Sequence, residues 1–431
     1  MSKIICSLED WDSIFNYHRP NGSSKTWYIR ETKKMSIPYM WGDWNILNED
    51  GEMFENEQLK AQITPQYSKL IEYTPKESIK NSPHIYIITN YVRTFFTDNY
   101  DIGFKCVSPE YLKDVRDGKS KILILFIYEG YSGSDIENNN DFEIIEKWRI
   151  DSNLPENSVY YLNGNLLSEE IVKDKGYKFI AKGIHYFEPW NKYNGEMVEF
   201  KPIDERNLFL SYNRATRSHR IRFIVDLFEN NIIDRGLISI NKLYEAYFPI
   251  TPEVKEFFDN KTPMTIDSVS TLKYNLAINI TVEDYEKTFI SVVTETLSCP
   301  NTLFFSEKIW KPIMVGHPFI VFGNQYSLKY LKGLGFKTFD KWINESYDNE
   351  PDSDTRSKMI VNELMKFEKM GIDELQKVRK EMYEICQHNY NHFKTYYYQK
   401  YGDNDESKTI RDILLEIWND ISDIKPKRSL I

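Results

Sequence analysis

The chain has 431 residues, of which 41% are hydrophobic and 15% aromatic, enough for two domains of ordinary size with full cores. Its formal net charge of −10 argues against non-specific nucleic-acid binding, which requires a basic surface. The four cysteines are far apart and form no Cys-x-x-Cys pair, so they predict free thiols rather than a disulfide framework or a zinc site.

The amino-terminal stretch MSKIICSLEDWDSIF lacks the long apolar region of a secretory signal peptide. No run of residues approaches the roughly 18 apolar positions of a transmembrane helix. We therefore expect a cytoplasmic protein, in a bacterial or virus-infected cell, with no integral membrane segment.

Alternating apolar residues predict strands in the first half of the chain. The first seventy residues are aromatic and irregular and give no clear periodicity. Beyond them, the candidate strands are 84–89, 121–128, 158–164 and 177–187. A helical pattern at 141–153 lies between two of these, and strands separated by helices are typical of a parallel sheet.

A polar, proline-bearing stretch at 193–207 predicts a domain boundary, after which strands and helices alternate again. Strands are expected at 208–212, 289–294 and 318–323, and helices at 218–232, 327–335 and from about 355 onward. The predicted organisation is an α/β domain at 1–200, a second α/β domain at 201–375, and C-terminal helices at 376–431 that pack back on the first domain.

The segment from Val292 to Gly323 breaks local rules at the start of a helix. Its strand ends at Glu295, and the carboxyl ends of strands are where open α/β sheets bind ligands. Ser306 is a good N-cap and Glu307 is favoured in the first turn, whereas Lys308 opposes the helix dipole. Pro312 removes a further helical hydrogen bond, so the helix should be short or kinked.

A bound diphosphate would remove this misfit, because helix N-termini attract phosphate and Lys308 adds a positive charge. Glu307 or Glu295 would then accept hydrogen bonds from the two neighbouring hydroxyls of a ribose. The alternative is an ordinary Glu-Lys pair in an exposed first turn. If the diphosphate interpretation holds, Lys308 should cost stability in the free protein, and Lys308→Ala should be at least as stable as the wild type.

The stretch SYNRATRSHRIR places clustered arginines between a strand and a helix, a position typical of phosphate sites. Arg214 and Arg217 lie in the turn and are the better candidates for phosphate contacts. Asn213 is expected to cap the turn or touch the ligand. Arg220 and Arg222 have a simpler interpretation as solvated helix residues, and a solvated basic turn is the alternative for the whole stretch.

Residues near the strand at 318–323 have weaker signals. His317 precedes the strand and is either a ligand contact or a turn residue. Asn324 and Gln325 follow it, and either is a candidate for contact with a base. The spacing of histidines, cysteines and carboxylates predicts no metal site.

Taken together, E…SEKIWKPI…GHPFIVFG resembles the donor-binding signature of the α1,3-fucosyltransferase family and its bacterial and phage-borne relatives. In that signature a glutamate precedes Thr-Glu-Lys, an apolar helix and a strand. Here Ser306 replaces the threonine, and Thr296-Leu297 stands where the family has Asn-Ser. The resemblance covers roughly 208–350. It implies the GT-B fold, in which two Rossmann-like domains face a cleft and a nucleotide sugar binds mainly to the second.

The same resemblance implies a glycosyltransferase, inverting and metal-independent, that moves a hexosyl or deoxyhexosyl group from a nucleotide-diphospho-sugar to an acceptor hydroxyl, without a further cofactor. Residues 1–200 would form the acceptor side and supply the base that deprotonates the acceptor. Glu129, directly after a predicted strand, is the first candidate for this base, and Asp98, Asp135 and Glu188 are the others.

Three alternatives for the acceptor and the activity stay open. The acidic net charge mildly favours a surface glycan as acceptor. A hydroxymethylated base of viral DNA is the second possibility. The third is a non-catalytic protein that binds nucleotides or glycans on the same fold, because a fold alone does not imply a function.

Overall fold

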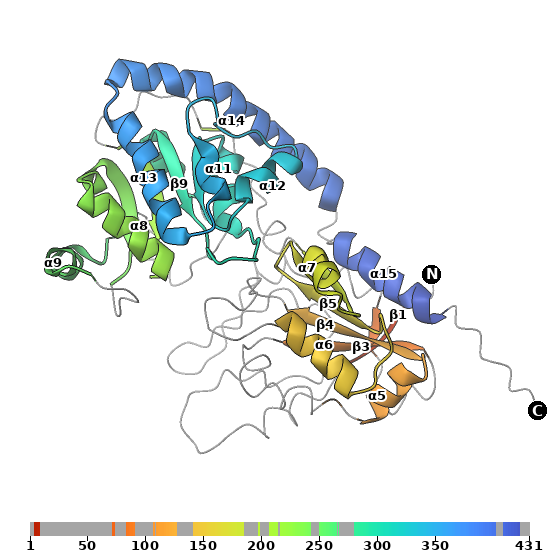
Figure 1. Cartoon of the computed structure of the whole chain (residues 1–431). Helices are drawn as coiled ribbons and strands as arrows, with labels where there is room; N and C mark the ends of the chain where they lie inside the picture. Colours follow the sequence, from red (N-terminus) through yellow and green to blue (C-terminus); the bar gives the residue numbers. More distant parts are fainter. Residues whose placement is uncertain are drawn as a thin grey trace, which may run out of the picture. The chain divides into compact units, whose positions relative to one another are not determined.

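Two parallel β-sheets with helices packed on them form the described part of the chain (Figure 1). The chain divides by its internal contacts into a first unit, 1–184 with 400–431, and a second unit, 185–399. The computed structural model describes residues 4–8, 71–73, 83–90, 107, 109–126, 141–184, 197–198, 207–213, 216–242, 250–264, 266, 280–401 and 408–422.

The sheet of the first unit has six described strands in the order β2-β1-β3-β4-β5-β6, and all neighbouring strands are parallel. Its strands are β1 Ile4–Leu8, β2 Ile71–Tyr73, β3 His84–Asn90, β4 Ser120–Phe126, β5 Val159–Asn163 and β6 Ile180–Gly183. Its helices are α5 Pro109–Arg116, α6 Asp141–Asp151, α7 Ser168–Lys175 and α15 Lys408–Ser422.

Helices cover both faces of this first sheet. Tyr86 of β3 stacks on Tyr111 of α5, with ring centroids 3.9 Å apart, in a buried cluster that also contains residues of α6. Because side chains alternate along a strand, Lys121 of β4 points to the opposite face, where it pairs with Asp420 of α15 at 3.3 Å. The last helix of the chain therefore packs on the first sheet, against β1, β3 and β4.

The second unit contains a four-stranded parallel sheet in the order β10-β9-β7-β8. Its strands are β7 Phe209–Asn213, β8 Gly236–Ile240, β9 Ile290–Thr294 and β10 Phe319–Phe322. Its helices are α8 Ser218–Glu229, α9 Pro252–Lys261, α10 Val282–Glu286, α11 Glu307–Val315, α12 Ser327–Gly333, α13 Ser353–Glu368 and α14 Ile372–Tyr401, with short 3₁₀ segments at Ile233–Arg235 and Glu345–Asn349.

Buried strands and buried polar contacts between helices both contribute to the packing of the second unit. Every residue of β9 is buried, as expected for a parallel strand covered on both faces. Helices α8 and α13 pack side by side (Figure 1), and Ser357 of α13 donates a hydrogen bond of 2.5 Å to the buried Asp226 of α8.

The predicted α/β class, with Rossmann-like parallel sheets and a helical C-terminus, is confirmed. The strands predicted from alternation are present within a few residues of their expected limits. The domain limits predicted from the sequence were 1–200, 201–375 and 376–431; in the structure α14 lies in the second unit as far as residue 399. Among the described helices, none combines the length and apolarity that a membrane span requires.

Candidate functional site

The strand order of the second sheet creates a topological switch point. From β7 the chain runs through α8 to β8 on one side, and from β9 it runs through α11 to β10 on the other. Connections that leave neighbouring strands in opposite directions open the position at which α/β sheets bind ligands. We call this place, formed by the ends of β7 and β9 and the starts of α8 and α11, the switch-point edge.

Glu295 follows β9 at this edge and is fully buried. Its Oε2 accepts hydrogen bonds from the backbone N–H groups of Thr296 and Ser306, both at 3.1 Å, and from the Ser306 hydroxyl. Its Oε1 has no hydrogen-bond partner within the described part of the chain. Burial raises the pKa of Glu295, and nearby Lys308 and Ser306 offset this only in part. The side chain of Glu295 therefore holds Ser306 in position at the start of α11.

Ser306 begins α11 as predicted. Its hydroxyl accepts from the backbone N–H of Lys308 at 3.3 Å, which satisfies one of the free donors of the first turn. The helix has nine residues, contains Pro312, and ends at Gly316, whose φ of 68° is left-handed. A short helix was expected from the proline, and the glycine gives it a clean end.

Lys308 is engaged on three sides by acceptors of the protein. Its Nζ donates to Glu307 Oε1 at 2.9 Å, to Thr296 Oγ1 at 3.1 Å and to Ser306 Oγ at 3.3 Å. Burial alone would raise the pKa of Glu307, but attraction to Lys308 and to Lys311 lowers it below its ordinary value, so Glu307 is ionised at neutral pH.

These contacts change one expectation about Lys308. The sequence suggested that this side chain costs stability because it opposes the helix dipole. In the structure, its ammonium group compensates a carboxylate that is only 16% exposed, and such hydrogen bonds outweigh the dipole penalty of a few tenths of a kcal/mol to about 1 kcal/mol. We therefore expect Lys308 to stabilise the free protein.

Asn213 at the end of β7 is fully buried and connects the two strands of the switch point. Its Oδ1 accepts from the Thr294 hydroxyl at 2.6 Å, and its Nδ2 donates to the Ser211 hydroxyl at 2.9 Å. Arg217 occupies the N-cap position of α8, partly buried, without a side-chain cap. Arg214 lies outside the described residues.

Arg220 differs from its predicted role as a solvated residue, because its side chain is buried. It donates to the carbonyl oxygens of Thr294 at 3.1 Å and Glu295 at 2.8 Å, so it holds the end of β9 in place. The sequence did contain a signal for this: Phe223 and Ile224 follow at spacings of three and four, on the same apolar face of α8.

His219 contacts the same carbonyl oxygen of Glu295, with its Nε2 at 2.9 Å. Burial, followed by repulsion from Arg220, lowers the pKa of His219 to about 3. A neutral imidazole can still donate one hydrogen bond, so it fits this carbonyl without a charge.

Two residues that sequence reasoning missed fix the loop between Glu295 and Ser306. Arg356 of α13 is buried; it donates to the carbonyl oxygen of Gly323 and, at 3.2 Å, to the Ser298 hydroxyl. At Gly323 a Cβ would lie 3.0 Å from the Cβ of Glu295, so glycine leaves the room in which that side chain packs.

Asn324 was a candidate for a base contact, but its amide is used inside the protein. It donates to the carbonyl oxygen of Cys299 at 3.0 Å and accepts from the backbone N–H of Phe304 at 3.2 Å. The side chain is buried. Asn324 therefore shapes the same loop as Arg356.

His317 lies at the start of β10, at the amino edge of the sheet, away from the switch-point edge. Its Nε2 donates to the carbonyl oxygen of Thr288 at 3.0 Å, and its Nδ1 accepts from the Ser291 hydroxyl at 2.9 Å. The interpretation of His317 as a ligand contact at the candidate site is therefore wrong, and its role is to join β9 and β10.

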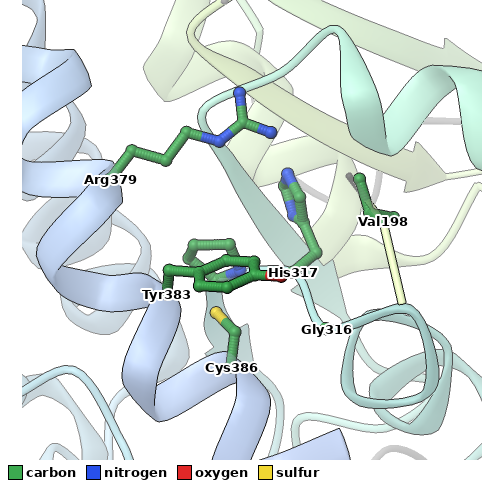
Figure 2. Close-up of a pocket in the computed structure, with 7 residues that line it drawn as sticks. Val198, Gly316, His317, Arg379, Tyr383 and Cys386 are labelled. Atoms are coloured by element: carbon green, nitrogen blue, oxygen red, sulfur yellow. The ribbon is translucent and has the colours of Figure 1, made fainter. Parts of the chain in front are cut away.

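A small cavity adjoins this histidine. Figure 2 shows the side chains of Arg379 and Tyr383, both from α14, reaching toward His317. The cavity has a volume of about 10 Å³, which is room for one water molecule at most. It is too small for a nucleotide or a sugar.

Burial, followed by repulsion from Arg379, lowers the pKa of His317 from 6.5 to about 3. Between pH 6.5 and pH 3, His317 binds a proton in the unfolded chain but not in the folded chain. The unfolding free energy therefore has its full value above pH 6.5 and falls as the pH decreases toward 3. We predict that His317→Asn reduces the loss of unfolding free energy between pH 7 and pH 5 by about 2 kcal/mol. Urea unfolding of both proteins at the two pH values measures this difference.

Equal pH dependence in the wild type and His317→Asn would contradict the assignment of a neutral, buried imidazole.

The three carboxylates proposed as the catalytic base, Glu129, Asp98 and Glu188, lie outside the described residues, as does Asp135. They stay predictions. Within the described ranges, no group of three or more His, Cys, Asp or Glu side chains is placed to hold a metal ion.

No protein-family model matches the chain, and no curated protein sequence matches it; the resemblance to the α1,3-fucosyltransferase family stays a prediction. Among solved structures, the chain is similar to the catalytic domain of Starch Synthase IV from Arabidopsis thaliana bound to ADP and acarbose. The identity is 11% and the TM-score 0.33, with 80% of this chain and 79% of that chain covered. A similarity this low carries no functional argument, so the function is argued from the residues of the switch-point edge.

Proposed function

We propose that this chain is a glycosyltransferase of GT-B architecture that transfers a sugar from a nucleotide-diphospho-sugar to an acceptor hydroxyl. The observation that supports this most is the position of Ser306, Glu307 and Lys308 at the switch-point edge, where open α/β sheets bind nucleotides. The resemblance of the same residues to the fucosyltransferase donor signature supports the same class of donor.

The diphosphate is proposed to bind between the starts of α11 and α8. Both helices direct backbone N–H groups and the positive end of their dipoles toward this edge. Lys308 and Arg217 supply the positive side chains, with Arg214 as the further candidate. As the bond between the sugar and the diphosphate breaks, negative charge grows on the departing nucleoside diphosphate. Fixed positive groups at the site stabilise that charge.

The two glutamates have different proposed roles. Glu307 is partly exposed beside Lys308, and it is the proposed acceptor of hydrogen bonds from the ribose hydroxyls. Glu295 is fully buried and already binds Ser306, so it positions the start of α11. Asn213 braces the strand end beneath them.

The acceptor side is proposed to lie within residues 1–200, with a surface glycan as the acceptor and Glu129, Asp98 or Glu188 as the base that removes the proton from its hydroxyl. The resemblance implies an inverting reaction that needs no metal ion and no cofactor beyond the donor. Transfer to hydroxymethylated DNA bases is the alternative acceptor chemistry.

A panel of UDP-, GDP-, CMP- and dTDP-sugars tests the proposal, first by thermal shift and then by release of free nucleotide. We expect one nucleoside diphosphate to raise the melting temperature of the protein. The corresponding nucleotide sugar should release free nucleotide, either by slow hydrolysis or by transfer of its sugar. Binding without turnover would leave a non-catalytic nucleotide-binding protein. No response to any member of the panel would refute the proposal.

Arg217→Ala is expected to weaken nucleoside diphosphate binding by about 1.5–3 kcal/mol, because a charge-assisted contact to phosphate is lost. Isothermal titration calorimetry measures the change. Arg235→Ala is the matched control, since this arginine of the same unit lies at the amino end of β8 and pairs with Glu368 at 2.6 Å. If Arg217→Ala bound the nucleoside diphosphate with unchanged affinity, Arg217 would not be a phosphate contact.

A further inference from the structure

The ammonium group of Lys308 has three N–H donors, and the protein supplies three acceptors for them. Thr296 and Ser306 offer neutral hydroxyl oxygens, at 3.1 and 3.3 Å. Glu307 offers the one charged acceptor, at 2.9 Å. An incoming anion therefore has to replace at least one of these acceptors, and Glu307 is the acceptor whose negative charge repels it.

The displaced carboxylate would be poorly solvated. The Glu307 side chain is only 16% exposed, and that of Lys308 is 23% exposed. Next to them, Glu295 is fully buried. An ionised carboxylate that loses Lys308 keeps only its attraction to Lys311. In such a place this loss is costly unless new donors reach the carboxylate.

We propose that Glu307 is an internal counter-anion that makes the site select nucleoside diphosphates over inorganic phosphate and diphosphate. This inference rests on the proposed function. A nucleoside diphosphate takes Lys308 with its phosphates and gives the released Glu307 two ribose hydroxyls as donors. Inorganic diphosphate takes Lys308 and gives Glu307 nothing in return.

The selection has a chemical use in the proposed reaction. Inorganic phosphate and diphosphate carry the same charged groups as the donor, so a site built only from cations would bind them as well. Because of Glu307, only a ligand that also carries a ribose can bind its phosphates to Lys308 without leaving the Glu307 carboxylate unpaired. Specificity of this kind comes from penalising the wrong ligand as well as favouring the right one.

The test compares Glu307→Gln and Glu307→Ala with the wild type by calorimetry, using inorganic diphosphate and the nucleoside diphosphate that binds best. Without the competing charge, both variants should bind inorganic diphosphate about tenfold more tightly. Their affinity for the nucleoside diphosphate should stay the same or fall, because the ribose contact is weakened. The ratio of the two dissociation constants should therefore shrink by at least about tenfold.

Glu253→Gln is the matched control, because this glutamate also lies in the first turn of a helix, α9, away from Lys308. It should change neither affinity. If the variants fold and bind inorganic diphosphate no better than the wild type does, the inference is overturned while the proposed function stands. If the wild type binds no nucleoside diphosphate, the proposed function fails instead. The alanine variant keeps the test decisive if the glutamine variant does not fold.

Discussion

Lys308→Ala is expected to weaken nucleoside diphosphate binding at least about tenfold and to lower sugar transfer by a similar or larger factor. The diphosphate loses its point charge at the start of α11, and the leaving group loses its stabilisation. The same substitution should lower the unfolding free energy by about 1–2 kcal/mol, because it leaves Glu307 without the ammonium group at 2.9 Å. Calorimetry, a transfer assay and urea unfolding measure the three effects.

Lys341→Ala provides the control for this prediction. Lys341 pairs with Glu381 at 2.8 Å on the surface of the same unit, with 66% of its side chain exposed. It should change neither ligand affinity nor transfer. If Lys308→Ala bound nucleotide as well as the wild type, the donor site would have to lie elsewhere.

Arg356→Ala is expected to cause the largest loss of stability, about 3 kcal/mol or more. The guanidinium is buried and donates to the Ser298 hydroxyl, to the carbonyl oxygen of Gly323 and, at 3.0 Å, to that of Glu350. Without it, buried acceptors lose their donors and the loop that leads to Ser306 loses its support. Nucleoside diphosphate binding should therefore fall as well, although Arg356 is not assigned to the ligand.

Arg356→Lys separates charge from geometry in this prediction. A lysine restores the positive charge but not the planar fork of donors, so it should recover only part of the stability. Full recovery would show that charge alone matters. Wild-type stability in Arg356→Ala would contradict the structural role derived from these contacts.

The sequence predicted most strands of the two sheets because a buried parallel strand is a short apolar run with a recognisable end. It missed β8 and the strands before residue 74. The segment GLISI is five residues long and follows directly on a 3₁₀ turn, and β2 has only three residues. Such short strands are stabilised by their neighbours in the sheet, which local periodicity does not report.

The sequence predicted where the candidate site lies, but not how its side chains contact one another. Glu295 could be placed at a strand end, yet its burial depends on Ser306 folding back onto it from eleven positions away. Arg356 acts on Ser298 across a separation of 58 positions. Arg220 was predictable, because helical periodicity puts it on the apolar face of α8. Its charge outweighed that signal in the sequence interpretation.

The packing of α15 on the first sheet has a consequence for the order in which the chain folds during its synthesis. The first unit consists of 1–184 and 400–431, whereas the second is one continuous segment. A ribosome therefore completes all of 185–399 before it makes the helix that contacts β1, β3 and β4. Domains generally fold as units in the order of their synthesis. Here the second unit becomes complete first, and the earlier sheet receives the helix α15 only after residues 185–399 have been made.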